Sequence, residues 1–293
     1  MEISCPQTGM ELLRLLRTAA EGKTIVDAQT AAVLHREKDL LRTAAGEEAG
    51  SEMTALLCGR DVSAVLREFA DVLSILIPEI VPLIGFDQHN PHHDRDVWEH
   101  TIAVTTAAPA TPVMRWAALL HDIGKPACFA ILEDGLGHFY GHAQESQRMA
   151  EEILTRFGIA ESMRARIGEL IRYHDFPIPP ERKRLNRLVL KHGEETVRQL
   201  IALHIADTMG QSQLCQGRVE EYCAVESLLN ALLQEEPPFS IRDLAVNGRD
   251  LMALGFQGKA IGEALRRCFD AVTGGVLPND KDTLLRWVRS DFQ

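Results

Sequence analysis

A histidine and an aspartate stand side by side at the end of an apolar segment, as His121 and Asp122 in the stretch LLHDIGKP. A further histidine, His100, lies upstream in a second segment of helical character. Neutral imidazole binds first-row transition metals, and carboxylate also binds harder cations. Mixed histidine and aspartate ligands therefore indicate a site for a divalent ion that polarises phosphate oxygens.

Two helices are expected to position these side chains. Apolar residues recur at helical spacing between Val113 and Leu120, which predicts a buried helix with the His-Asp pair at its C-terminal end. Gly124 and Pro126 then end the helix and leave the pair where a site can open to substrate. His100 belongs to a second amphipathic helix, so two rigid elements could face each other across one ion.

An isolated His-Asp pair is more often a structural histidine beside a surface aspartate. Here eight of the eleven histidines fall between His89 and His174, and His142, His174 and Asp207 follow at the ends of further helical segments. This concentration of ligand-type residues favours the metal site over the structural interpretation.

Five segments resemble, in order, the motifs of the HD-domain metal-dependent phosphohydrolases: HHDRDVWEH, LLHDIGKP, GHFYGHAQES, IRYHD and HIADTMGQS. More narrowly, GFDQHNPHHDRDVWEHT resembles the HD domain carried by bacterial CCA-adding tRNA nucleotidyltransferases. The similarity continues through FSIRDLAVNGRDLMALGFQGKAIGEAL and VLPNDKDTLLRWV, so it covers nearly the whole chain.

The resemblance implies six metal ligands: His100, His121, Asp122, His142, His174 and Asp207. His100, His121, Asp122 and Asp207 match the set shared by HD domains, which is enough for one ion with open positions. The other two histidines match members that hold two ions, with Asp122 bridging. We therefore expect one or two divalent ions, drawn from Mn, Fe, Ni, Co, Mg and Zn.

These ligands predict a phosphohydrolase, either a phosphatase or a phosphodiesterase, that attacks nucleotides or RNA ends with metal-activated water. Asp122 and Lys125 are the expected catalytic residues. Lys125 is also placed to bind a substrate phosphate, although many such lysines are merely exposed helix-end residues. His92 and His93 are candidate substrate contacts or, equally, loop residues. HD domains also include triphosphohydrolases, which stay a further possibility.

A different class of function is the alternative: a non-catalytic relative of the CCA-adding enzymes that binds tRNA or a partner head. Glu11 and Arg14 stand where that family's neck motif carries nucleotide-selecting residues, but the match is partial. The sequence before them has no glycine-rich loop or paired aspartates for two-metal nucleotidyl transfer, so we expect no CCA addition by this chain alone.

The composition fits a soluble cytoplasmic protein. No segment approaches the roughly 18 apolar residues that a membrane span requires, and MEISCPQTG lacks the order of a signal peptide. The six cysteines show no CxxC spacing and are expected to be reduced. The net charge of -11 opposes general nucleic-acid binding, although Arg182-Lys183-Arg184 lies in a locally basic region. That region is more simply a solvated helical face.

The expected fold is all-α, an HD-domain helical bundle with a short β-hairpin near residues 129–140. Helices are predicted over 9–20 and 161–173, and another is predicted to begin at His142. In the tail, helices are predicted around 243–254, 258–272 and 280–289. The predicted domains are a neck-like region (1–84), the HD domain (85–212) and a C-terminal body and tail region (213–293). The sequence does not indicate an oligomeric state.

Overall fold

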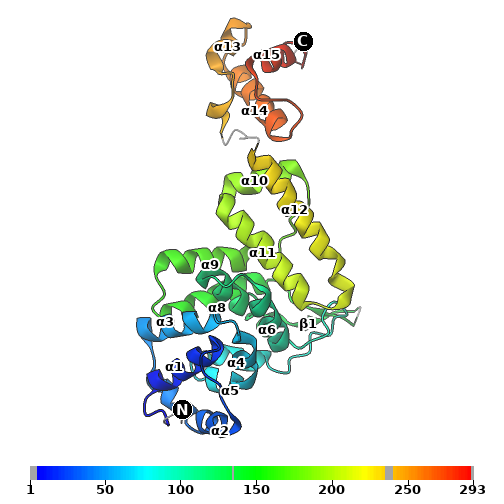
Figure 1. The fold of residues 1–293 in the computed structure, drawn as a ribbon. Coiled ribbons are helices and arrows are strands. Elements are labelled where there is room, and N and C mark those ends of the chain that lie inside the picture. Colours follow the sequence, from blue (N-terminus) through cyan, green and yellow to red (C-terminus); the bar gives the residue numbers. More distant parts are fainter. Residues whose placement is uncertain (1–4, 134, 235–239, 292–293) are drawn as a thin grey trace. The chain divides into compact units, whose positions relative to one another are not determined.

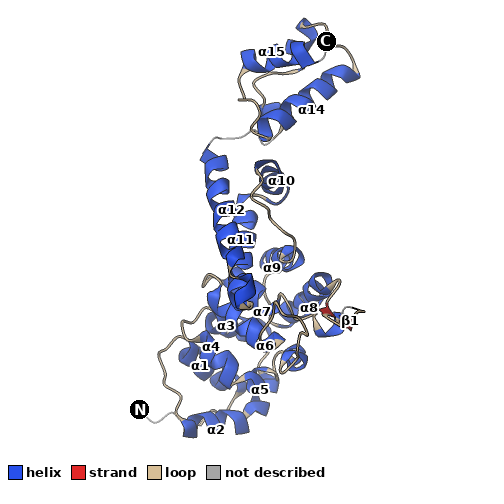
Figure 2. Ribbon diagram, turned by 90° about the vertical axis from the view of Figure 1, so that its right-hand side faces the viewer, coloured by secondary structure: helices blue, strands red, loops and turns tan. Residues whose placement is uncertain are grey.

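The computed structural model describes residues 5–133, 135–234 and 240–291. The fold is all-α with one short hairpin, as predicted (Figures 1 and 2). It divides into two compact units. The first unit contains residues 1–176 and 199–219, and the second contains residues 177–198 and 220–293. The predicted three-part division at residues 84 and 212 remains a prediction.

The first unit contains most of the helices. They are α1 (Gly9–Ala20), α2 (Ala28–Arg36), η1 (Lys38–Thr43), α3 (Gly46–Leu57), α4 (Val62–Glu68), α5 (Ala70–Leu73), η2 (Pro78–Leu83), α6 (Val97–Ala107), α7 (Pro112–Leu120), η3 (Pro126–Cys128), α8 (His142–Arg156), α9 (Glu161–Tyr173) and η4 (Gln213–Cys215). Two of the three unit boundaries fall within longer helices, α11 (Glu194–Gly210) and α12 (Gly217–Gln234), and the third follows Phe176.

Helix α7 is the central element of the first unit. Every residue from Met114 to Leu120 is buried, and the helix packs against α3, α6, α8 and α9. Two of its buried side chains also form hydrogen bonds: Trp116 Nε1 donates to Thr54 Oγ1 over 2.8 Å, and Arg115 donates to the Thr105 carbonyl. Each fully buried large apolar side chain contributes about 1.5–3 kcal/mol. This packing holds the C-terminal end of α7, with the His-Asp pair, in one place.

Local signals in the sequence set several helix ends. The Asp96 carboxylate caps α6 by accepting from Glu99 N over 2.7 Å, and it also accepts from Gly85 N over 3.0 Å. Pro112 occupies the first turn of α7, where its missing N–H costs nothing. The left-handed Gly141 (φ 82°) turns the chain into α8. Helices α6, α7 and α8 therefore begin at defined residues, and α6 and α8 carry His100 and His142 near their N-terminal ends.

The predicted hairpin is present. Strands β1 (Ala130–Ile131) and β2 (Gly137–His138) pair antiparallel, with Ala130 opposite His138 and Ile131 opposite Gly137. Figure 2 shows the hairpin in red beside the blue helices. Gly137 N also donates to the His89 carbonyl over 2.8 Å, which attaches the hairpin to the loop before α6.

The second unit contains α10 (Arg182–His192), η5 (Ile241–Asp243), α13 (Gly248–Ala253), α14 (Lys259–Thr273) and α15 (Lys281–Asp291). Leu244, Leu251, Cys268 and Leu284 belong to the buried core of its tail helices. The predicted tail helices are present, but the first of them starts at Gly248 because Asn247 forms a capping box with Asp250. Within the described ranges, none of the helices combines the length and apolarity that a membrane crossing requires.

Candidate metal centre

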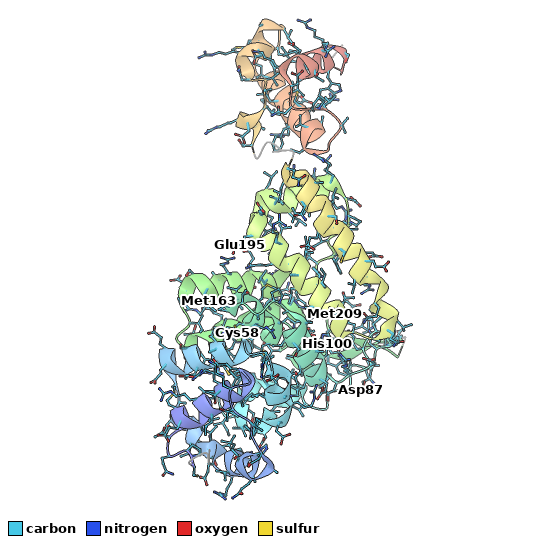
Figure 3. The ribbon with its side chains drawn as sticks, viewed as in Figure 1. Cys58, Asp87, His100, Met163, Glu195 and Met209 are labelled. Atoms are coloured by element: carbon cyan, nitrogen blue, oxygen red, sulfur yellow. The ribbon has the colours of Figure 1, made fainter. Side chains whose placement is uncertain are left out.

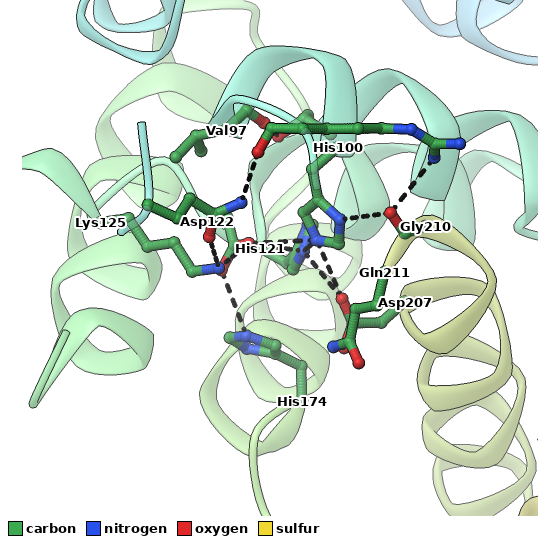
Figure 4. Close-up of polar contacts among 12 residues, drawn as sticks. Val97, His100, His121, Asp122, Lys125, His174, Asp207, Gly210 and Gln211 are labelled. Atoms are coloured by element: carbon green, nitrogen blue, oxygen red, sulfur yellow. Dashed lines mark hydrogen bonds and ion pairs between the residues drawn. The ribbon is translucent and has the colours of Figure 1, made fainter. Parts of the chain in front are cut away.

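His100 and His121 meet in the interior of the first unit. His100 lies on α6, His121 follows the last residue of α7, and both side chains are fully buried. Their Nε2 atoms are 3.4 Å apart. Figure 3 shows His100 within the first unit, and Figure 4 shows the two imidazoles converging beside Asp122. The two predicted helices therefore do bring these residues together.

Asp122 lies between two groups of imidazoles. Its Oδ2 is 3.4 Å from His100 Nε2 and 3.1 Å from His121 Nε2. Its Oδ1 is 3.4 Å from His142 Nε2 and 3.6 Å from His174 Nε2. One carboxylate thus presents a different oxygen to each histidine pair, and two three-residue groups with metal-ligand geometry share Asp122.

His142 and His174 form the second pair, at the start of α8 and directly after α9. Their Nε2 atoms are 3.2 Å apart, and both side chains are buried. The predicted helix boundaries at residues 142, 161 and 173 agree with the structure, so both histidines occupy helix ends as expected.

Asp207 joins the first pair from α11. Its Oδ1 is 3.0 Å from His100 Nε2 and 3.7 Å from His121 Nε2. Gln211 Nε2, one turn later, donates to Asp207 Oδ2 over 2.8 Å and holds that carboxylate in place (Figure 4). All six predicted ligand candidates therefore lie around one point of the structure.

The four imidazoles share one hydrogen-bonding pattern. In each, Nδ1 contacts a backbone carbonyl oxygen: Gly210 for His100 (3.2 Å), Ala118 for His121 (2.8 Å), Phe139 for His142 (2.9 Å) and Ile171 for His174 (2.7 Å). A carbonyl only accepts, so Nδ1 carries the proton and the neutral ring presents its Nε2 lone pair to the interior. This pattern orients metal-binding histidines in proteins.

When its histidines are neutral, the six ligand candidates offer one another no hydrogen-bond donor at the centre of the cluster, and the donors near it are Lys125 and Gln211. Nε2 lone pairs and carboxylate oxygens are all acceptors, and Asp122 Oδ1 is buried with no hydrogen-bond partner among the described residues. Acceptors this close repel one another unless a cation lies between them. The donor set, with imidazole nitrogens and carboxylate oxygens, fits a divalent transition metal.

The carboxylates shift the pKa values of the two buried imidazoles beside them. Burial lowers the pKa of His100 and His121, but Asp122 and Asp207 outweigh it and raise the pKa of both imidazoles, that of His121 to about 10. Burial raises the pKa of the two carboxyls, but the neighbouring positive groups hold both pKa values well below the usual range. The site therefore stabilises positive charge at its centre.

Lys125 is buried against the same carboxylate. Its Nζ lies 2.7 Å from Asp122 Oδ2, donates to Gln88 Oε1 over 2.9 Å and lies 5.3 Å from the centre of the Phe139 ring. The structure thus places this predicted catalytic lysine at the cluster rather than on an exposed helix end. Gln88, which the sequence reasoning did not single out, is its buried partner.

The neighbouring residues His92 and His93 are placed differently. His93 is partly buried, lines the cavity beside the cluster, and its ring centre is 5.2 Å from that of His100. Burial, together with Lys125 and His100, lowers the pKa of His93 to about 3. His92 is exposed, and its Nδ1 lies 3.6 Å from Cys215 Sγ. The structure brings only His93 to the site.

A cavity of about 370 Å³ opens next to the cluster. Asp122, Lys125, His142, His174 and Asp207 line one part of it. Sequence reasoning missed further lining residues, namely Asn90, His138, Phe139, Tyr140 and Gln211. These residues sit inside the quoted motifs, but nothing in their spacing distinguishes them from their neighbours.

Gly124 allows the loop after the His-Asp pair to approach α8. Its N–H donates to Ser146 Oγ over 3.0 Å, and a Cβ at this position would lie 2.7 Å from Ser146 N. We expect Gly124→Ala to lower the free energy of unfolding by about 1–3 kcal/mol and to reduce metal content, because the loop must move away from α8. Chemical denaturation and elemental analysis test this.

Gly168→Ala is the matched control in the same unit. Gly168 lies within α9, and a Cβ added there would be 3.5 Å from the Gln147 side chain, an ordinary van der Waals distance. This variant is expected to keep its metal content and to gain up to about 1 kcal/mol from the better helix former. Equal behaviour of the two variants would contradict the proposed role of Gly124.

Known proteins are similar to this chain in sequence and fold. Residues 97–234 match the family model described as HD domain. The A-adding tRNA nucleotidyltransferase of Deinococcus radiodurans is 32% identical over 240 residues, which cover 78% of this chain and 54% of that protein. The CC-adding tRNA nucleotidyltransferase of Thermus thermophilus is 29% identical over 256 residues, covering 83% and 57%. This chain spans about half the length of these curated relatives.

A solved structure shows a similar fold. The CCA-adding enzyme of Bacillus stearothermophilus, in complex with CTP, superposes with a TM-score of 0.51 and 18% sequence identity. The match covers 97% of this chain and 61% of that one. At this identity the similarity supports the fold alone.

Proposed function

This chain belongs to the HD-domain family, in the branch related to the tRNA nucleotidyltransferases, and from this premise we propose that it is a divalent-metal-dependent phosphohydrolase. Its proposed substrates are phosphomonoesters or phosphodiesters of nucleotides or RNA ends. The observation that carries the proposal is Asp122, whose two oxygens face two separate pairs of imidazole Nε2 lone pairs.

The proposal assigns each ligand candidate to one of two ions. His100, His121 and Asp207 would hold the first ion together with Asp122 Oδ2, and His142 and His174 would hold the second together with Asp122 Oδ1. A divalent ion supplies Lewis acidity, which lowers the pKa of a coordinated water and polarises a phosphoryl oxygen. Mn, Fe, Ni, Co, Mg and Zn are the candidate ions.

Protein side chains have the remaining roles. Lys125 presents a positive charge in the cavity and would bind a substrate phosphate, while Gln88 keeps its ammonium group oriented. The partly buried His93 would contact the substrate from the loop before α6. His92 is exposed and lies beside Cys215, so we assign it no substrate contact.

Metal content and hydrolysis together test the proposal. The purified chain is loaded with Mn, Ni, Co or Mg and examined by elemental analysis. It is then assayed on 2′,3′-cyclic nucleotides, 2′-nucleotides and simple phosphate esters. About two ions per chain with metal-dependent turnover are expected. Absence of both bound metal and turnover would overturn the proposal.

Metal binding should release protons at neutral pH. Because the pKa of His121 is raised to about 10 in the metal-free site, its imidazole is protonated at pH 7 and must lose that proton to bind an ion. We therefore expect the apparent dissociation constant to fall roughly 10-fold per pH unit for each released proton between pH 7 and 9. Calorimetry in two buffers of different ionisation enthalpy measures the release, and buffer-independent heats would contradict it.

tRNA binding without hydrolysis is the second candidate, since the two relatives above are named for tRNA. One structural observation favours it: α10 exposes Lys183, Arg184, Arg187 and Lys191 along one short helix of the second unit. Such a chain would bind tRNA or support a separate nucleotidyltransferase head. A gel shift with tRNA at increasing salt tests this candidate, because phosphate contacts predict steeply weaker binding.

A further inference from the structure

Two ring-bearing residues of the hairpin segment line the cavity next to the metal ligands, and the proposed hydrolysis assigns them no role. His138 and Tyr140 share the cavity with Asp122 and Lys125. Tyr140 is 73% exposed, whereas the four histidine ligand candidates and Asp122 are buried. The tyrosine therefore offers a large apolar ring with a polar hydroxyl beside the cavity, a combination suited to contact with a ligand.

The rings of His138 and Tyr140 are stacked on each other and together form a ring surface at the cavity. The ring centres of His138 and Tyr140 are 5.4 Å apart, and their planes differ by 10°. Phe139, between them in the sequence, packs instead against Phe129 and Phe86, with ring centres 5.4 Å and 6.4 Å away. Phe139 also lines the cavity, but its aromatic contacts attach the segment to the first unit.

Both ends of this segment are held by the protein. At Gly137, a Cβ would lie 2.0 Å from the Gln88 carbonyl oxygen, so only glycine permits this approach to the loop before α6. At the other end, Gly141 adopts a left-handed conformation and leads into His142, whose Nδ1 bonds to the Phe139 carbonyl over 2.9 Å. The ring surface is thus connected directly to a proposed metal ligand.

We propose that His138 and Tyr140 form a stacking surface for the nucleobase of the substrate, so that this site selects nucleoside phosphates over base-free phosphate esters. The inference rests on the proposed function and names its substrate class. A cavity of about 370 Å³ accommodates one nucleotide-sized ligand, with its phosphate at the ligand cluster and its base at the rings. Stacking uses the π-face that every base possesses, so it favours the larger purines without reading base identity.

Substitution of Tyr140 tests the stacking surface. The metal-loaded full chain is assayed on 2′,3′-cyclic AMP and, as a base-free ester, on glycerol 2-phosphate. Tyr140→Ala is expected to reduce kcat/KM for the nucleotide about 5- to 100-fold, mainly through KM, and to leave the base-free ester within about 2-fold. Tyr140→Phe keeps the ring and should retain most of the activity on the nucleotide. Ile131→Ala, an exposed position on the same hairpin, is the matched control.

A binding measurement separates this inference from the proposed function. Calorimetric titration of the metal-loaded protein with 2′-AMP and with inorganic phosphate needs no turnover. Weaker binding of 2′-AMP to Tyr140→Ala, with unchanged phosphate binding, supports the stacking surface even if no ester is hydrolysed. Metal-dependent hydrolysis in which Tyr140→Ala affects nucleotide and base-free ester equally would overturn the inference and leave the phosphohydrolase proposal intact.

Discussion

Asp122→Asn is expected to remove both metal ions and to reduce kcat about 10³-fold or more. The change keeps the shape of the side chain but converts one of two ligand oxygens into an amide group that cannot bind a cation. Because Oδ1 and Oδ2 face different histidine pairs, no orientation of the amide serves both ions. A loss of about 4 kcal/mol in transition-state stabilisation corresponds to this factor in rate. Steady-state kinetics and elemental analysis on the same preparation measure it.

Asp175→Asn is the matched control for this substitution. Asp175 is exposed and lines the same cavity, but it lies outside both three-residue groups. Asp175→Asn makes the same change of charge as Asp122→Asn. Because Asp175 is exposed and is not a ligand candidate, we expect two bound ions and a kcat within about 3-fold of the parent protein. Circular dichroism checks that both variants fold. Retention of two ions and full turnover by Asp122→Asn would refute the bridging role.

His174→Ala is expected to remove one ion and keep the other. The variant leaves His100, His121, Asp122 and Asp207 in place, so the first group stays complete while the second loses one of its two imidazoles. Hydrolysis that needs both ions should fall roughly 10²- to 10³-fold, because a single ion cannot stabilise both the attacking and the leaving oxygen. Metal analysis after gel filtration should show about one ion per chain.

Two further variants make this experiment discriminating. His100→Ala disrupts the other group and should also leave about one ion, now held by His142 and His174. His204→Ala removes a buried histidine of α11 outside the cluster, so it should keep both ions and report any general effect of losing a buried ring. If His174→Ala retains two ions, the assignment of that side chain as a ligand is wrong.

The sequence by itself determined most of the local structure. Leucine periodicity predicts α1, and the predicted ranges 9–20 and 161–173 coincide with α1 and α9. The glycines at 135 and 137 correctly indicated the hairpin. These features depend on residues within a few positions of one another, through capping, periodicity and turn chemistry, so a single sequence displays them.

The sequence also identified the ligand candidates. It did so because their motifs occur in a known order, and not because the spacing of the residues shows which side chains meet. Imidazole and carboxylate side chains are potential metal ligands wherever they occur in a sequence. Their spacing does not show that Asp207 reaches His100 across more than a hundred residues, or that the oxygens of Asp122 face different histidine pairs. Those relations depend on how the helices pack around α7.

Only the tertiary structure decided which neighbouring residues take part. His92 and His93 are adjacent and identical in type, yet one contacts Cys215 and the other lines the cavity. Gln88 and Tyr140 carry no recognisable signal in the sequence, but packing places the first against Lys125 and the second at the cavity mouth. The physical reason is that side-chain direction and burial are set by long-range packing, whereas sequence patterns record mainly the local preferences of the chain.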